Sequence, residues 1–163
     1  MSANVNFGQN SRFKTGWIVL VNSVLIRRSI EEVFDYCSDL ENELQWNPNG
    51  LVSLEALSSR PIVVGTKYVA HWKGSPPMTC EYTRIERPGV WEVYATGKGM
   101  DVAFRGQVAR QGDETRLTVT MALRPQGLLR LLAPIIRGAF QRGEVKNLAN
   151  VKAQMEGAAQ PRQ

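Results

Sequence analysis

Few side chains in this sequence combine acid–base chemistry with a place in a regular pattern. Tyr68, Glu81 and Tyr82 are the only plausible proton-transfer groups, and all three fall in strand-like segments. A carboxylate buried in an apolar cavity has a raised pKa and can serve as acid, base or anchor. In one register of its strand, Glu81 faces into the cavity. In the alternative register it faces outward or pairs with Arg84 or Arg105. No catalytic constellation is recognisable, so the catalytic residues remain unknown.

Two other polar residues attract attention for their positions. His71 is the only histidine, and strand alternation places it opposite Trp72, so we interpret it as a surface residue rather than a general base. Asn147 interrupts the apolar stripe of a C-terminal helix, where its amide bonds either a ligand oxygen or a backbone group in the core. Cys37 and Cys80 are far apart and form no metal-ligand pattern with the histidine, so no metal or cofactor is predicted.

A set of apolar and aromatic residues alternates along the predicted strands and continues at helical spacing near the C-terminus. Each large aromatic either packs under the helix or stacks against a bound ring. Because the order of elements suggests a sheet wrapped around one helix, which usually encloses a cavity, we expect the set to line a partly open cavity between strands and helix. The predicted ligand-cavity residues are Tyr68, Trp72, Glu81, Trp91, Val93, Phe104, Leu132, Ile136, Phe140 and Asn147.

The segments that position these residues are mostly short strands. Strands are predicted within residues 16–27 and over 51–57, 67–73, 78–86, 90–96, 100–110 and 115–124, with turns rich in Gly, Pro and Asp. In the segment 78–86 the inward face is left open, because alternation through Thr79 and Glu81 competes with alternation through Cys80 and Tyr82. Strands spaced this tightly predict an antiparallel meander.

Helical patterns occur in two places. Ser29 and Glu32 form a capping box that predicts a short helix, and Asp39 is expected to cap a second short helix to about residue 44. Over residues 128–155 apolar residues recur in steps of three and four, which predicts a long amphipathic helix. Pro134 is expected to kink this helix. The apolar face of this helix is wider in its first half. We expect that part either to line a cavity entrance, to contact a membrane surface or to contact another subunit.

Size and charge limit the classes of function. The 163 residues suit one domain, predicted over 16–157, with a loose tail at 1–15 and a frayed tail at 158–163. The net charge of +5 comes from scattered basic residues, which argues against nucleic-acid binding and equally fits a mildly positive cavity mouth that favours acidic ligands. Residues 17–26 are too few to span a bilayer, and the cysteine content favours a reduced, cytoplasmic setting. Peripheral membrane contact and a monomeric or homodimeric state are left open.

Several short motifs in the chain together resemble the pattern of one superfamily. In chain order, the motifs are Ser29 to Phe34, Asp39, Trp46-Asn47-Pro48, Gly65-Thr66, Glu86-Arg87-Pro88 and Thr115-Arg116-Leu117-Thr118. With these motifs in this order, the chain resembles the START-like, or SRPBCC, superfamily, and within it the polyketide cyclase/dehydrase-like branch. The resemblance implies an α+β helix-grip fold, in which a curved seven-stranded antiparallel sheet wraps around a long C-terminal helix and two short helices follow strand one. The resemblance includes no catalytic motif.

Three hypotheses of function follow. The leading one is binding of a hydrophobic or amphipathic small molecule, such as a lipid, an isoprenoid or a polyketide-like compound, in an internal cavity. The first alternative is an enzyme of the aromatase/cyclase type that closes and dehydrates a reactive chain. The second is an interaction protein with a vestigial cavity. Glu81 facing inward with a raised pKa favours the enzyme. An apolar pocket with no titratable group favours the carrier, and a filled core favours the interaction protein.

Overall fold

The computed structural model describes residues 16–157, so the two predicted tails lie outside the described residues. One antiparallel sheet has the strand order β1-β7-β6-β5-β4-β3-β2. Strands that follow one another from β2 to β7 are neighbours, which confirms the predicted meander. The strands are β1 (Ile18–Ile26), β2 (Leu51–Ala56), β3 (Lys67–Trp72), β4 (Met78–Glu86), β5 (Val90–Gly97), β6 (Met100–Gln111) and β7 (Glu114–Pro125).

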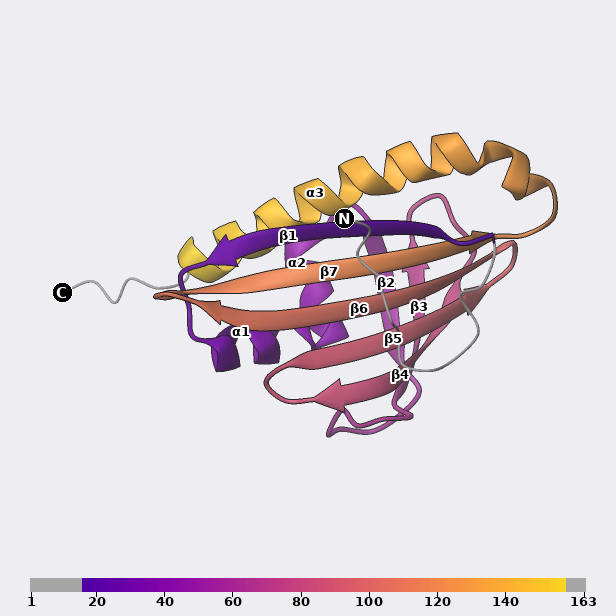
Figure 1. Ribbon diagram of the computed structural model, residues 1–163. Coiled ribbons are helices and arrows are strands. Elements are labelled where there is room, and N and C mark those ends of the chain that lie inside the picture. Colours follow the sequence, from indigo (N-terminus) through magenta and orange to yellow (C-terminus); the bar gives the residue numbers. More distant parts are fainter. Residues whose placement is uncertain (1–15, 158–163) are drawn as a thin grey trace.

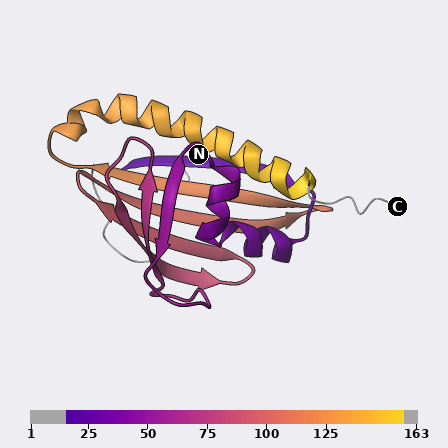
Figure 2. The ribbon, with the colours of Figure 1, turned by 180° about the vertical axis from the view of Figure 1, so that it is seen from behind.

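The helices lie on one side of the curved sheet. Figure 1 shows α3 running beside β1. Figure 2 shows α1 and α2 on the open side of the sheet, where α1 contacts β6 and β7 and α2 contacts β2. α1 and α2 follow β1 in the chain and lead to β2 at the opposite edge of the sheet. The predicted α+β helix-grip architecture is confirmed. The helical elements are α1 (Ile30–Cys37), η2 (Leu40–Asn42), α2 (Glu43–Trp46), η3 (Gly127–Leu132) and α3 (Ala133–Gly157).

The predicted capping box starts α1. The Ser29 hydroxyl accepts a hydrogen bond from the Glu32 backbone N–H at 3.2 Å, and the Glu32 carboxylate accepts one from the Ser29 N–H at 2.9 Å. Two of the amides left unpaired at a helix N-terminus are thereby satisfied. Val33 and Phe34 then bury the inner face of the helix against the sheet.

The inward face of β4 carries Met78, Cys80 and Tyr82, which are all buried. Glu81 lies on the opposite face, because successive side chains of a strand alternate. Its side chain is 45% exposed, and its carboxylate is 3.4 Å from the ammonium of Lys67. The expectation that Glu81 lines the cavity is therefore corrected: it forms a surface ion pair.

Trp91 of β5 occupies the centre of the inner face. Its ring meets Phe34 of α1 edge-on, with ring centroids 5.5 Å apart, and lies 6.3 Å from the ring of Phe104 on β6. Gly106 is directly opposite Trp91 in the β5–β6 register. A Cβ atom at position 106 would come within 2.1 Å of the indole ring, so the absence of a side chain makes room for Trp91.

The long C-terminal helix differs from expectation at its start. Residues Gly127–Leu132 form a 3-10 helix, and α3 begins only at Ala133. Pro134 is thus the second residue of α3, where proline is tolerated because the first-turn amides have no partner within the helix. Pro134 therefore lies at the start of α3 and not in the helix interior, where it was expected.

The second half of α3 is anchored to β1. Leu148, Val151 and Met155 are buried in the core. The Lys152 ammonium donates a hydrogen bond to the Leu25 carbonyl at 2.6 Å, which ties the helix to the backbone of β1. These contacts hold the last turns of α3 in place, while the first turns extend past the core.

The wide apolar arc near the start of this region faces solvent. Leu128, Leu131 and Ile135 are 84%, 79% and 68% exposed. Leu129 is less exposed and lies over the turn at Gly99. A Cβ atom added at Gly99 would be 2.9 Å from a methyl carbon of Leu129. Over residues 16–157, no helix is both long and apolar enough to cross a membrane.

Candidate ligand-binding cavity

A cavity of about 600 Å³ lies between the inner face of the sheet, α2 and α3. Its walls come from segments far apart in the sequence, because the sheet curves toward α3. The lining is predominantly apolar, as is usual for small-molecule sites. The main apolar lining residues are Trp46, Trp72, Met78, Trp91, Val93, Ala95, Val102, Phe104, Met121 and Phe140.

Exposed lining residues mark the mouth of the cavity. Pro48 and Asn49 come from the turn after α2, Lys73 from the turn after β3, and Gly143 and Lys146 from α3. The rim is therefore built from two turns and one face of the helix. Lys73 and Lys146 are exposed at this rim, but the cavity lining also carries three carboxylates, so it has no excess of positive charge. These carboxylates belong to Asp39, Glu43 and Glu144.

Six of the ten predicted cavity residues lie along this lining. Of the other four, Glu81 faces outward, and Leu132 lies in η3, with its side chain 45% exposed. Ile136 is half-buried one turn into α3, before the helix reaches the cavity. The six that line it are Trp72, Trp91, Val93, Phe104, Phe140 and Asn147.

Tyr68 faces inward as expected but packs beneath η2 instead of lining the cavity. Its hydroxyl donates a hydrogen bond to the Glu41 carboxylate at 3.2 Å, and its ring meets that of Tyr82 at 6.4 Å. Burial and the nearby Glu41 raise the pKa of Tyr68 to about 12. His71 of β3 is not among the cavity-lining residues.

Tyr82 lines the cavity, but its hydroxyl is engaged by backbone groups. It donates to the Ser38 carbonyl at 2.7 Å and accepts from the Leu40 N–H at 3.0 Å. Burial raises the pKa of the phenol well above its ordinary value. Tyr82 therefore stabilises the link between α1 and η2 and is a poor candidate for proton transfer at neutral pH.

Glu43 of α2 is a buried carboxylate that sequence reasoning missed. It is 8% exposed and lines the cavity. One carboxylate oxygen accepts hydrogen bonds from the Trp72 indole N–H at 2.9 Å and from the Asn47 amide at 2.8 Å. Burial raises the pKa of Glu43, and the two hydrogen bonds partly oppose this rise. α2 has only four residues, so no helical periodicity marked this position in advance.

Glu144 of α3 is a second buried carboxylate that was missed. It is 6% exposed and lines the same cavity. Within residues 16–157, no hydrogen-bond donor or basic side chain contacts its carboxylate. Burial, with a contribution from the negative charge of Glu43, raises the pKa of Glu144 to about 7. Helical spacing could have predicted this position, because Glu144 lies four residues from both Phe140 and Leu148 and so shares the apolar face of the helix with them.

Polar atoms of α2 and α3 complete the site. The Trp46 indole N–H is buried without a hydrogen-bond partner in the described part of the chain. The Trp46 carbonyl, by contrast, accepts from the Asn150 amide at 2.9 Å, which joins α2 to α3. The amide of Asn147 has no partner among residues 16–157. A ligand with one polar end could satisfy such groups, since buried polar atoms are rarely left unpaired.

The two cysteines are free thiols, and both line the cavity. Burial raises the pKa of Cys37 and of Cys80 to about 12. The thiolate is the nucleophilic form of cysteine. Both thiols therefore stay protonated at neutral pH and act as small apolar side chains.

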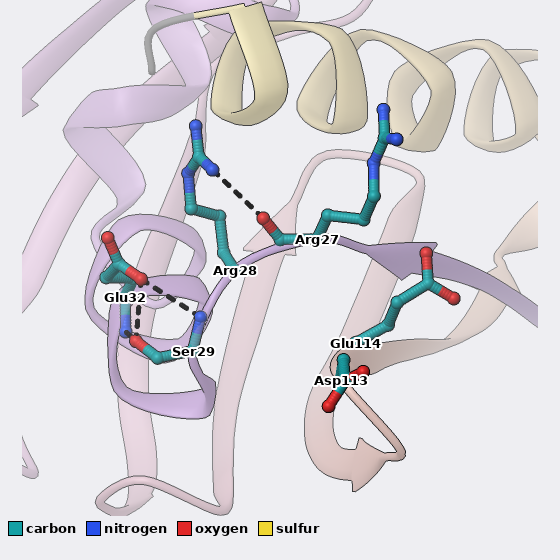
Figure 3. A pocket seen from close by; sticks show the side chains of 6 residues that line it. All are labelled: Arg27, Arg28, Ser29, Glu32, Asp113 and Glu114. Carbon is teal, nitrogen blue, oxygen red and sulfur yellow. Dashed lines mark hydrogen bonds between the residues drawn. The ribbon is translucent and has the colours of Figure 1, made fainter. Parts of the chain in front are cut away.

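A second, shallow pocket lies at the surface near the start of α1. Figure 3 shows Ser29 and Glu32 facing each other in the capping box, with Asp113 and Glu114 of the β6–β7 hairpin nearby. All six of its lining side chains are charged or polar, which does not suit an apolar ligand. Within residues 16–157, no group of three or more His, Cys, Asp or Glu residues is placed to hold a metal ion. The larger apolar cavity is therefore the candidate site.

Solved structures of other proteins share this fold at low sequence identity. A START superfamily protein from Mycobacterium smegmatis has a TM-score of 0.72 and 14% identity, covering 86% of this chain and 99% of that one. A hypothetical protein from Helicobacter pylori has a TM-score of 0.69 and 15% identity, with coverages of 89% and 91%. CalU16 from Micromonospora echinospora has a TM-score of 0.60 and 15% identity, with coverages of 88% and 77%. At these identities the likeness shows the fold alone.

Sequence comparison identifies the family. No curated protein sequence matches the chain significantly. The model of one family, described as polyketide cyclase / dehydrase and lipid transport, matches residues 18–156, which is nearly all of the described chain. The match includes every strand and helix that contributes to the cavity. The chain therefore belongs to the polyketide cyclase / dehydrase and lipid transport family.

Proposed function

We propose that this protein binds a hydrophobic or amphipathic small molecule, such as a lipid, an isoprenoid or a polyketide-like compound, in the cavity between the sheet and α3. The observation that carries the proposal is the cavity itself, which measures about 600 Å³ and has three indole rings in its lining. Volumes of this order are typical of small-molecule sites. The family description, which joins cyclases with lipid transport, is in keeping with such a ligand.

Affinity would come mainly from the apolar walls. Burial of apolar surface contributes about 25 cal/mol per Å², so a ligand against Trp91, Phe104 and Phe140 gains most of its free energy from area. Polar groups would then set its orientation. The unpartnered Trp46 N–H offers a donor and Glu144 an acceptor, which suggests a ligand with one polar end.

The experiment is native mass spectrometry of the protein purified from its own host, with extraction and identification of any bound compound. A matched pair of variants locates the site. Gly143 lines the cavity mouth, and a Cβ there would meet no atom within 4 Å, so Gly143→Leu should narrow the cavity without disturbing α3. Gly138→Leu makes the same change on the same helix outside the cavity lining, where its Cβ would meet only the end of the Arg142 side chain, at 3.4 Å.

We expect a stoichiometric ligand on the wild type and on Gly138→Leu, and at least about a ten-fold lower occupancy on Gly143→Leu. Both variants should fold, since leucine favours a helix over glycine by up to about 1 kcal/mol. An unliganded wild type that is not stabilised by a panel of lipids, isoprenoids and aromatic polyketides would overturn the proposal. Equal occupancy of the two variants would place the ligand elsewhere.

A second candidate function, cyclisation or dehydration of a polyketide-like chain, is favoured by one observation. Glu144 has a pKa of about 7 inside an apolar cavity, and such a carboxyl is suited to transfer protons near neutral pH. If this function holds, Glu144→Gln should abolish turnover of a reactive poly-β-keto substrate while leaving its binding intact. Binding without turnover in the wild type would leave the carrier function.

The third hypothesis, an interaction protein with a vestigial cavity, is less favoured because the cavity is large. An interaction protein was expected to have a filled core, whereas this protein has a cavity of about 600 Å³. A cytoplasmic location, peripheral membrane contact and a monomeric or homodimeric state stay predictions from the sequence.

A further inference from the structure

The cavity contains a carboxylate that its own protein leaves without a partner. Glu144 projects from the face of α3 that lines the cavity, with 6% of its surface exposed. Within residues 16–157, its carboxylate receives no hydrogen bond and forms no ion pair. Burying an unpaired carboxylate carries a large desolvation cost, so such a group is rare unless something pairs with it.

A second carboxylate lies on the same cavity. Glu43 of α2 is fixed by Trp72 and Asn47, which donate to the same one of its oxygens. α2 packs against α3, and the charge of Glu43 acts directly on Glu144. Two buried carboxylates therefore share one apolar space, and each makes the ionised form of the other less favourable.

No basic side chain of the described residues compensates this pair. The two cations on the cavity lining, Lys73 and Lys146, are exposed at its mouth and form no ion pair with either carboxylate. The remaining titratable groups of the lining are Cys37, Asp39, Cys80 and Tyr82, all acids. The missing partner is therefore a positive charge or a strong hydrogen-bond donor that enters from outside.

An ammonium group fits this environment better than a hydroxyl. It carries a full positive charge against two carboxylates and has up to three N–H donors, whereas a hydroxyl has one donor and no charge. Hydrogen bonds between charged groups are roughly twice as strong as neutral ones. The indole rings of Trp46 and Trp72 also line the cavity, and aromatic faces attract cations.

We propose that Glu144 and Glu43 bind the protonated amino group of an amphipathic amine, whose apolar body fills the rest of the cavity. This inference rests on the proposed binding function and specifies the chemical class of its ligand. The amine enters at the rim formed by the turns after α2 and β3, and its head lies between α2 and α3. Glu144 is the principal partner because Glu43 already accepts two hydrogen bonds.

Three probes with the same alkyl chain test the inference by isothermal titration calorimetry: decylamine, decanol and decanoate. At pH 8 we expect decylamine to bind at least about ten-fold more tightly than decanol, from the usual strength of charge-assisted hydrogen bonds. Decanoate should bind most weakly. Glu144→Gln should weaken decylamine about ten-fold and leave decanol within about two-fold. Glu81→Gln, the same change at an exposed glutamate outside the cavity, should alter none of the three affinities.

Proton release gives a readout that a purely structural role of Glu144 would not change. The pKa of Glu144 is about 7, so at pH 7 part of the population is protonated and must lose its proton to pair with an ammonium. Titrations in buffers with different ionisation enthalpies should show a fraction of a proton released on decylamine binding. Decanol should release none, and Glu144→Gln should abolish most of the release.

The outcomes separate the two proposals. If decanol and decanoate bind as tightly as decylamine, or Glu144→Gln leaves the preference unchanged, the amine inference is overturned and the cavity-binding function stands. If no probe binds and no compound co-purifies, both are overturned. The comparison of the three probes on the wild type needs no variant, so it remains decisive even if Glu144→Gln folds poorly.

Discussion

At the scale of single residues, Glu144 makes the stability of the protein depend on pH. The ordinary pKa of 4.5 applies to the unfolded chain, and burial raises the folded value to about 7. The folded state thus holds the proton more tightly, so stability falls as pH rises through the interval between these two values. A shift of this size corresponds to roughly 3 kcal/mol.

We therefore expect Glu144→Gln to be more stable than the wild type at pH 8 and to differ little from it at pH 4.5. Urea denaturation at the two pH values measures this. The pKa of Glu43 is also raised by burial, so part of the pH dependence should persist in the variant. Glu81→Gln is the matched control and should follow the wild type at both pH values. A wild type and a Glu144→Gln variant that lose equal stability between pH 4.5 and 8 would contradict the assignment.

At the scale of elements, the β5–β6 pair depends on the absence of a side chain at Gly106. The Trp91 ring lies across this position and also contacts Phe34 of α1, so it has little room to move. We expect Gly106→Ala to destabilise the fold by about 1–3 kcal/mol, the usual cost of overpacking a core. Thermal or urea denaturation measures the loss.

Gly112 provides the comparison on the same sheet. It lies in the turn between β6 and β7, where a Cβ would meet no atom within 4 Å, but its φ of 61° favours glycine. Gly112→Ala should therefore cost only the strain of a left-handed backbone, roughly 1 kcal/mol, and should leave the tryptophan emission spectrum of the protein unchanged. Gly106→Ala should shift that spectrum, because the Trp91 ring must move. Identical spectra for the two variants would contradict the packing argument.

At the scale of the whole molecule, the order of the sheet predicts a gradient of local stability. β6 and β7 are paired along both edges, whereas β2 is an edge strand paired only with β3 and exposes Val52. Amide hydrogen exchange should therefore be slowest in β6 and β7 and fastest, among the strands, in β2, since exchange follows local opening. Slower exchange in β2 than in β6 would contradict this.

A cavity ligand should change exchange at the rim more than in the centre of the sheet. The turns that carry Asn49 and Lys73 are exposed and border the cavity mouth. Saturating decylamine should slow the exchange of amides in these turns, and Gly143→Leu should remove the effect while Gly138→Leu retains it. If decylamine instead slows amide exchange only in η3, the ligand binds at the apolar surface formed there by the exposed Leu128 and Leu131.

The order of the elements and about half of the apolar wall could be predicted from the sequence. Alternation placed Trp91, Val93 and Phe104 on the inner face, and the capping box at Ser29 located the start of α1. These are local patterns: a period of two in strands, a period near 3.6 in helices and a hydrogen bond between neighbours in sequence. Local patterns can be read from one segment at a time.

Which carboxylates belong to the cavity could not be predicted, because it depends on packing between distant segments. Glu81 was expected inside but pairs with Lys67 at the surface, whereas Glu43 and Glu144 line the cavity. The register of β4 had two competing patterns, and the face that is buried carries Tyr82, whose hydroxyl bonds the backbone of Ser38 and Leu40. The raised pKa of Glu144 likewise depends on burial between α3 and the sheet and on the charge of Glu43. Such environments arise between segments that are distant in the sequence, so no single segment contains them.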